Sequence, residues 1–239
     1  MTATDPAVAE TFGPYEANCV KIMRQLLAEK PAGSLDEHAF PAYLQGNPPS
    51  RWLFWRRIEY AFHHAALLGN DNEAGNLACM DFGCGSGLLL PRLHAFYPTV
   101  YGVDLRPEAA GAFLGKWYER ETGYGKIKLL GDVMSEEIPR GTLDLILAFD
   151  VLEHISDLDP MLKRFGELLK PGGRIVVSGP TENFLYKIGR KIVGFSGDYH
   201  VHNIATIRQA MRKFYEVRIL RRLYWPASLF WILEARKRG

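Results

Sequence analysis

Residues 81–87 read Asp81-Phe82-Gly83-Cys84-Gly85-Ser86-Gly87, directly after an apolar run and directly before three leucines. The apolar run fits a buried strand, and the leucines fit the start of a helix. Three glycines at alternate positions leave the turn without Cβ atoms, so backbone N–H groups can approach a ligand closely. The sequence therefore predicts a ligand-binding loop between a strand and a helix.

Short apolar runs alternate with helical patterns after this loop, which is typical of an α/β fold with a mainly parallel sheet and crossover helices. The expected strands are 77–82, 100–104, 127–130, 143–149 and 174–178. The expected helices are 88–96, 107–121, 160–169, 184–193 and 206–214, with Lys170-Pro171-Gly172-Gly173 ending the third as a C-terminal turn. Two extended runs, 216–224 and 229–236, predict an antiparallel hairpin at the sheet edge.

The first third of the chain has a different pattern. Helical periodicity covers 17–30 and 52–68, with a proline-rich break between them, and the polar segment 69–76 fits a linker. We therefore expect two domains: a helical N-terminal extension or cap over 1–74, and a ligand-binding domain over 75–239.

Acidic residues follow three successive expected strands. Asp81 precedes the glycines and suits an ammonium or sulfonium group, Asp104 can accept hydrogen bonds from ribose hydroxyls, and Asp132 can accept one from an exocyclic amine such as that of adenine. The glycine spacing is GxGxG and lacks the GxGxxG of dinucleotide-binding domains, which disfavours a nicotinamide cofactor. Taken singly, these residues also fit a tight turn, a helix N-cap at Asp104 and a turn residue at Asp132.

Residues from about 77 to 236 resemble the class I S-adenosylmethionine-dependent methyltransferases, in particular their small-molecule branch. The resemblance is carried by the glycine loop, Asp104, Leu152-Glu153-His154 and Leu169-Lys170-Pro171-Gly172-Gly173, in this order. It implies a Rossmann-like seven-stranded, mostly parallel sheet with an antiparallel last strand, and S-adenosylmethionine as cofactor. The cofactor-binding residues that it implies are Asp81, Gly83, Cys84, Gly85, Gly87, Asp104, Leu105, Asp132, Val133 and Phe149.

The candidate catalytic residues are Glu153 and His154, which with Asp150 would share one face of a helix after the fourth strand. Such a cluster can act as a base with an orienting carboxylate. It also fits a divalent-metal pattern that Asp198, His200 and His202 would complete, although a purely structural role is favoured and no metal is expected.

The predicted acceptor is a small molecule with a hydroxyl nucleophile, apolar and either quinone-like or lipid-linked. The candidate substrate-binding residues are Asp150, Asn183, His200 and His202. Residues 184–195 mix three cations with bulky apolar side chains, and would form a lid, an interfacial helix or a core helix with solvated lysines. Aromatic residues also lie beside arginines in 52–57 and 221–225. This pattern favours either a hydrophobic or anionic acceptor, or peripheral contact with a membrane surface.

Composition narrows the remaining alternatives. The 239 residues carry 29 basic and 27 acidic side chains, and the resulting charge of +2 gives no support for nucleic-acid binding. Three cysteines without CxxC spacing predict reduced, buried thiols, and the start of the chain lacks the pattern of a secretory signal, so we expect a cytoplasmic protein. The alternatives are a protein or nucleic-acid methyltransferase, a nicotinamide-dependent oxidoreductase, and a binding module without catalysis.

Overall fold

The structure is a computed structural model that describes residues 11–29, 43–44, 48–69, 77–118, 125–184, 201–224 and 226–237. The chain divides into two compact units, Met1–Asp132 and Val133–Gly239, which are described separately below. Seven strands lie in the described residues, and they confirm the expected α/β, mostly parallel sheet.

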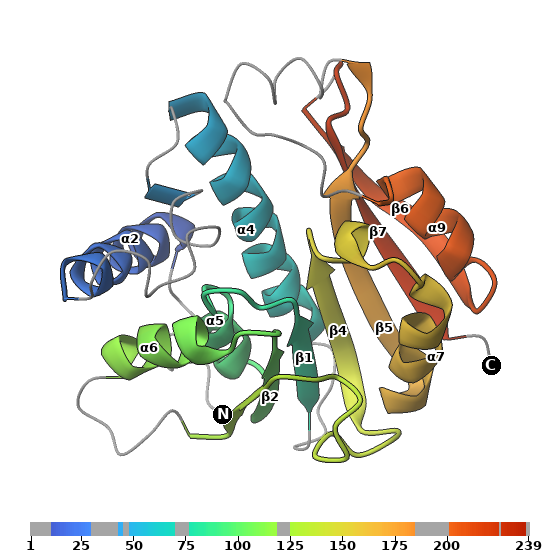
Figure 1. Ribbon diagram of the computed structural model, residues 1–239, viewed down its shortest axis with the longest axis horizontal. Helices are drawn as coiled ribbons and strands as arrows, with labels where there is room; N and C mark the ends of the chain where they lie inside the picture. Colours follow the sequence, from blue (N-terminus) through green and yellow to red (C-terminus); the bar gives the residue numbers. More distant parts are fainter. Residues whose placement is uncertain are drawn as a thin grey trace. The chain divides into compact units, whose positions relative to one another are not determined.

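In its described residues, the first unit combines the two N-terminal helices α2 and α4 with a parallel sheet of order β3-β2-β1 (Figure 1). Its elements are α2 (Phe12–Glu29), α4 (Pro48–Gly69), β1 (Ala78–Phe82), α5 (Leu90–His94), β2 (Thr99–Val103), α6 (Glu108–Trp117) and β3 (Ile127–Leu130). Every residue of β1 is buried, as expected for a central parallel strand. The predicted glycine loop follows β1 and precedes α5.

The helix α2 is anchored on the glycine loop. Its Tyr15 hydroxyl donates a hydrogen bond to the carbonyl oxygen of Leu88 at 2.5 Å, and the Tyr15 ring lies 5.1 Å from the Trp117 ring of α6. On the neighbouring helix α4, the Phe62 ring receives the Arg92 guanidinium of α5 at 3.8 Å from its centroid. The helical extension thus shares a core with the loop and its flanking helices.

The second unit has a mixed sheet of order β4-β5-β7-β6. Its elements are β4 (Leu143–Phe149), the 3-10 helix η1 (Leu152–His154), α7 (Leu158–Leu168), β5 (Leu169–Pro180), α9 (Ile204–Met211), β6 (Tyr215–Leu223) and β7 (Phe230–Lys237). The strand β5 runs parallel to β4, and β7 runs antiparallel to both β5 and β6. Figure 1 shows α9 beside β6 and β7, and both the hairpin and the antiparallel last strand are confirmed.

Several boundaries differ from expectation. The helix α4 begins at Pro48, because proline suits the first turn, where backbone N–H groups lack helical partners. The helix α7 ends before Lys170-Pro171-Gly172-Gly173 as predicted, but these four residues belong to β5, whose pairing with β4 shifts register there. The expected linker 69–76 and helix 184–193 lie outside the described residues except for Gly69 and Phe184.

Two further expectations concern burial and membrane spanning. Cys19, Cys79 and Cys84 are free and buried, which confirms the prediction for the thiols. Within the part of the chain that the structure describes, no helix is long and apolar enough to cross a membrane.

Candidate functional site

The glycine loop has the backbone conformation that its composition predicts. Gly83, Gly85 and Gly87 have φ values of 74°, 52° and 75°, in the left-handed region where side chains are strained. The N–H groups of Gly83 and Cys84 donate to the carbonyl oxygen of Val103 at 2.8 and 3.1 Å. These bonds hold the loop against the end of β2.

Two of these glycines are required for different reasons. A Cβ atom on Gly87 would lie 3.0 Å from Cβ of Ala110 in α6, so this glycine permits close packing of the loop against α6. A Cβ atom on Gly85 would meet no atom within 4 Å, so the space in front of Gly85 is open. A ligand can therefore approach the backbone at Gly85, while Gly87 keeps the loop compact.

Asp104 is half-buried directly after β2, and its carboxylate supports the loop. The Gly85 N–H donates to Oδ2 at 2.9 Å, and the Arg106 N–H donates to Oδ1 at 3.0 Å. Each carboxylate oxygen has a second lone pair for a hydroxyl donor such as those of a ribose. The residue at the N-cap of α6 is Pro107, so the alternative role of Asp104 as that N-cap is wrong.

Asp81 lies near the C-terminal end of β1, and it is only 4% exposed. Burial, and to a lesser degree the negative charge of Asp104, raises the pKa of Asp81 to about 7. A cationic ligand group nearby would favour the charged carboxylate, so this site fits an ammonium or sulfonium group. The same burial and the two carboxylates raise the pKa of the Cys84 thiol, which keeps it uncharged.

The loop also contains a buried polar atom. Ser86 is 3% exposed, and its Oγ has no hydrogen-bond partner among the described residues. Buried hydroxyls usually have a partner, so a ligand with polar groups fits beside this loop. The open Gly85 backbone, the Asp104 lone pairs and the Asp81 carboxyl together fit a molecule with a ribose and an amino acid part.

Apolar side chains are exposed next to two of the predicted acidic positions. Leu105 is 91% exposed beside Asp104, and Asp132 is exposed at the end of the first unit. In the second unit, Val133 is buried and Met134 is 44% exposed. The sequence analysis did not single out Met134, which follows the predicted positions Asp132 and Val133 directly.

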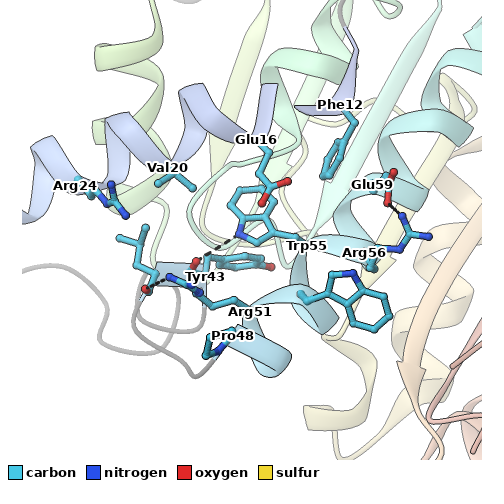
Figure 2. Close-up of a pocket in the computed structure, with 12 residues that line it drawn as sticks. Phe12, Glu16, Val20, Arg24, Tyr43, Pro48, Arg51, Trp55, Arg56 and Glu59 are labelled. Atoms are coloured by element: carbon cyan, nitrogen blue, oxygen red, sulfur yellow. Dashed lines mark hydrogen bonds and ion pairs between the residues drawn. The ribbon is translucent and has the colours of Figure 1, made fainter. Parts of the chain in front are cut away.

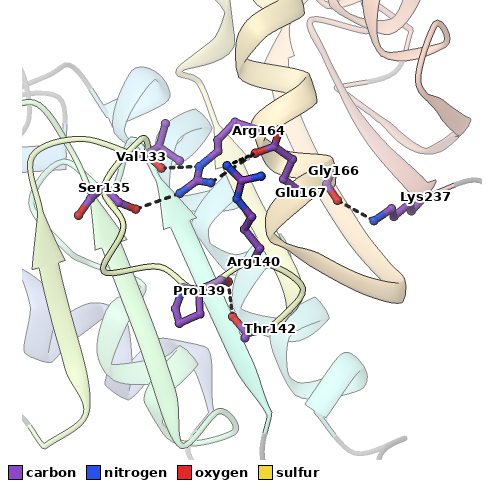
Figure 3. A network of polar contacts seen from close by, with 9 residues as sticks. All are labelled: Val133, Ser135, Pro139, Arg140, Thr142, Arg164, Gly166, Glu167 and Lys237. Atoms are coloured by element: carbon purple, nitrogen blue, oxygen red, sulfur yellow. Dashed lines mark hydrogen bonds and ion pairs between the residues drawn. The ribbon is translucent and has the colours of Figure 1, made fainter.

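The loop that begins at Val133 is held by a buried arginine of α7. Arg164 is 5% exposed, and its Nε and Nη2 donate to the carbonyl oxygens of Val133 and Ser135 at 3.2 and 2.9 Å (Figure 3). Glu167 lies 3.4 Å from Arg164 Nη1 and 3.7 Å from Arg140. Arg164 therefore fixes the position of the Val133 backbone, a role that the sequence did not reveal.

The predicted catalytic cluster has a different geometry from the one expected. Leu152–His154 is a single 3-10 turn, and Asp150 precedes it with φ 53°, so the predicted shared α-helical face is wrong. Glu153 is 2% exposed, whereas His154 is exposed. Asp150 is tied to β5: its N–H donates to the Ser178 carbonyl at 3.1 Å, and its Oδ1 accepts from the Ser178 hydroxyl at 3.3 Å.

Besides Asp150, two predicted substrate-binding residues, Asn183 and His202, lie in the described part of the second unit. The N–H groups of Val201 and His202 donate to the Glu153 carbonyl oxygen at 2.8 and 3.2 Å, which brings His202 beside the 3-10 turn. Asn183 donates to the carbonyl oxygen of Ala227 at 2.7 Å. Phe149 is half-buried at the end of β4.

The remaining predicted positions have no described counterpart. Asp198 and His200 lie outside the described residues, as does most of the amphipathic segment 184–195. Among the residues that are described, no group of three or more His, Cys, Asp or Glu side chains could hold a metal ion.

Residues 53–235 match a family model described as a methyltransferase domain. The chain is 35% identical over 113 residues to a ubiquinone biosynthesis O-methyltransferase of a Bradyrhizobium strain, covering 47% of this chain and 44% of that protein. It is 31% identical over 115 residues to an uncharacterized methyltransferase of Mycobacterium tuberculosis, covering 48% of this chain and 56% of that protein. The chain thus spans about half the length of these curated relatives.

Solved structures share the fold at low sequence identity. The N-methyltransferase NodS of Bradyrhizobium japonicum, in complex with S-adenosyl-L-homocysteine, aligns with a TM-score of 0.56 and 17% identity over 93% of this chain and all of that chain. A protein of Pyrococcus horikoshii aligns with a TM-score of 0.61 and 14% identity over 83% of this chain and 96% of that chain.

Proposed function

Because the chain belongs to the class I S-adenosylmethionine-dependent methyltransferases, we propose that it methylates a hydroxyl group of a small, apolar acceptor, quinone-like or lipid-linked. Bound S-adenosylmethionine would supply an electrophilic methyl group on a sulfonium sulfur. In the proposal, the helical segment 1–74 caps the domain over 75–239. The family match begins at residue 53, inside α4.

The observation that carries the cofactor proposal is the bond between Gly85 N–H and Asp104 Oδ2 at 2.9 Å. It ties the open glycine to the carboxylate that follows the next strand. The loop backbone would hold the amino acid part of the cofactor, and Asp104 would accept hydrogen bonds from its ribose. Asp81 would face the positive charge, while Leu105, Asp132, Val133 and Phe149 would contact the adenine and the ribose.

The proposal of a hydroxyl acceptor draws support from the curated relatives, since one of them is an O-methyltransferase of ubiquinone biosynthesis. A hydroxyl must lose its proton as the new O–C bond forms and the S–C bond breaks, and a base lowers the barrier. We assign this role to His154, because its side chain is exposed and a neutral imidazole has a ring nitrogen that can accept a proton.

The other groups near the 3-10 turn would support the acceptor. Glu153 is buried, and its backbone carbonyl receives the N–H groups of Val201 and His202. We therefore propose that Glu153 holds residues 201–202 against the 3-10 turn that carries His154. Asp150, Asn183, His200 and His202 remain the proposed acceptor-binding residues.

A methyl-transfer assay tests the acceptor class. The protein would be incubated with methyl-labelled S-adenosylmethionine and either a catechol with an alkyl chain or the matched aniline. Transfer to the catechol oxygen is the expected result. Transfer to the aniline alone would refute a hydroxyl acceptor, and transfer to a protein or nucleic acid in preference to either compound would refute a small-molecule acceptor.

Contact with a membrane surface is part of the same proposal. Trp52 and Phe184 are 55% and 77% exposed, and exposed aromatic side chains favour the interface of a bilayer. Sedimentation with anionic and with neutral phospholipid vesicles checks this point. Binding to neither kind of vesicle would contradict it.

A further inference from the structure

A cavity of about 500 Å³ lies between α2 and α4 in the first unit, and its lining includes no residue of the glycine loop. The helix α2 contributes Phe12, Glu16, Val20 and Arg24, which are four residues apart and so form one stripe along the helix. A second face of α2, which includes Tyr15, is buried in the core of the unit. The helix thus has one face that packs and another that opens into the cavity.

Aromatic rings form the wall of the cavity. Trp55 of α4 lies 5.2 Å from the Tyr43 ring and 6.2 Å from the Phe12 ring, measured between ring centroids. The indole N–H of Trp55 donates to the Tyr43 carbonyl oxygen at 3.3 Å, and Arg51 Nη1 donates to the Leu44 carbonyl oxygen at 3.4 Å. These bonds attach residues 43 and 44 to α4, so the wall is preformed and suits a flat apolar ligand.

The charges around the cavity are mainly positive. Arg24, Arg51 and Arg56 face Glu16 and Glu59, and Arg56 is paired with Glu59. Burial, followed by the charge of Glu59, raises the pKa of Glu16. Figure 2 shows Arg24 at one end of the cavity and Arg56 with Glu59 at the other, with Tyr43 and Trp55 between them.

We propose that this cavity binds a planar aromatic molecule that carries an anionic group. The aromatic wall would stack on or meet the edge of the ring system, and Arg24 and Arg51 would face the anion. Aromatic walls by themselves also attract organic cations, but among the described lining residues three arginines outnumber two glutamates, and this excess positive charge disfavours a cation. The volume is within the range of about 300–1,000 Å³ that is typical of small-molecule sites.

Three probes of one shape and different charge test the ligand class. Calorimetric titrations without cofactor would compare 2-naphthoate, neutral 2-naphthamide and cationic 2-(aminomethyl)naphthalene. We expect 2-naphthoate to bind about five-fold or more tightly than 2-naphthamide, and the cation to bind most weakly. Equal binding of the first two, tighter binding of the cation, or no binding of 2-naphthoate would overturn the proposal.

Substitutions on α2 locate the binding. Arg24→Gln should weaken 2-naphthoate about three-fold and leave 2-naphthamide unchanged. Lys21→Gln is the matched control, because Lys21 is exposed on the same helix and does not line the cavity. Val20→Trp should fill the cavity and abolish binding of 2-naphthoate, with circular dichroism confirming the fold. Unchanged binding by this variant would place the ligand elsewhere and refute the assignment.

Two sources of such a ligand can be distinguished. With S-adenosylmethionine present, 3-hydroxy-2-naphthoate would gain a methyl group if the cavity holds the methyl acceptor, and Val20→Trp would abolish that gain. A separate ligand would remain unmethylated and change the affinity for S-adenosylhomocysteine, because Tyr15 of α2 is bonded to Leu88 beside the glycine loop. Because binding is measured without cofactor, this proposal can fail while the proposed function stands.

Discussion

The replacement Asp81→Asn should change how the stability of the protein depends on pH. The pKa of Asp81 is about 7 in the folded protein, against about 3.9 in an unfolded chain. Between these values the folded state keeps a proton that the unfolded state releases, so unfolding becomes easier as the pH rises. Below about pH 4 both states are protonated, and this destabilisation vanishes.

The magnitude follows from the shift. Three pKa units at 1.36 kcal/mol each correspond to about 4 kcal/mol, which is an upper bound for this fully buried group. Asparagine is never charged, so the free energy of unfolding of the variant relative to the wild type should rise from about pH 4 to about pH 7. Above about pH 7 this difference should stay constant.

Urea unfolding of both proteins at pH 4, 5, 6, 7 and 8 measures this difference. Asp132→Asn serves as the control, because Asp132 is exposed and this substitution removes the same charge at the surface. Every other titrating group is shared, so its contribution cancels. A difference between Asp81→Asn and wild type that stays constant across this pH range would refute the assignment of a raised pKa to Asp81.

The remaining predictions concern the loop, the carboxylate, the buried arginine and the candidate base. Gly85→Ala should lower the affinity for S-adenosylhomocysteine and reduce the free energy of unfolding by only about 1 kcal/mol. Gly87→Ala should reduce the free energy of unfolding by more, because its Cβ atom would lie 3.0 Å from that of Ala110. Calorimetry and urea unfolding measure the two effects, and equal effects of the two substitutions would contradict the different roles given to these glycines. Asp104→Ala should weaken binding of S-adenosylhomocysteine by about 1.5–3 kcal/mol, measured by calorimetry, and unchanged affinity in a folded variant would remove the ribose assignment. Arg164→Met should lower the free energy of unfolding by about 2–4 kcal/mol, because the buried Val133 carbonyl oxygen and the part-buried Ser135 carbonyl oxygen lose their donors, and it should also weaken cofactor binding. A stable variant with full affinity would show that Val133 needs no such support. His154→Ala should keep the affinity for S-adenosylhomocysteine and lower turnover with a catechol, while full activity would leave His154 a structural role.

The parts of the fold that were predicted correctly depend on local sequence. The glycine loop needs positive φ values, which few residues other than glycine adopt, so its composition reveals its backbone. The apolar run before Asp81 and the runs of β3 and β4 have the length and composition of buried strands, and the bounds of β3 and β4 agree with the prediction. The burial of the free thiols and the antiparallel hairpin at the sheet edge could also be predicted from short-range patterns.

The parts that were missed depend on contacts between distant residues. Asp150 leaves the helical region because Ser178, 28 residues away, receives its N–H and donates to its carboxylate, so a helical wheel gave the wrong face. Arg164 lies 31 residues from Val133, and nothing in its neighbours shows that it is buried. The first turn of α2, which begins at Phe12, is held by Tyr15, whose hydroxyl donates a hydrogen bond to the carbonyl oxygen of Leu88, 73 residues away in the sequence.

Calorimetric titration with S-adenosylhomocysteine, with NADH as the control ligand, tests the central claim most directly. The loop, Asp104 and Asp81 predict saturable binding with a stoichiometry of about one, and no binding of NADH. At pH 6, below its pKa of about 7, Asp81 is mostly protonated, so binding of an ammonium group beside it should release protons and make the measured enthalpy depend on the buffer. Failure to bind S-adenosylhomocysteine, or saturable binding of NADH in its place, would contradict the account.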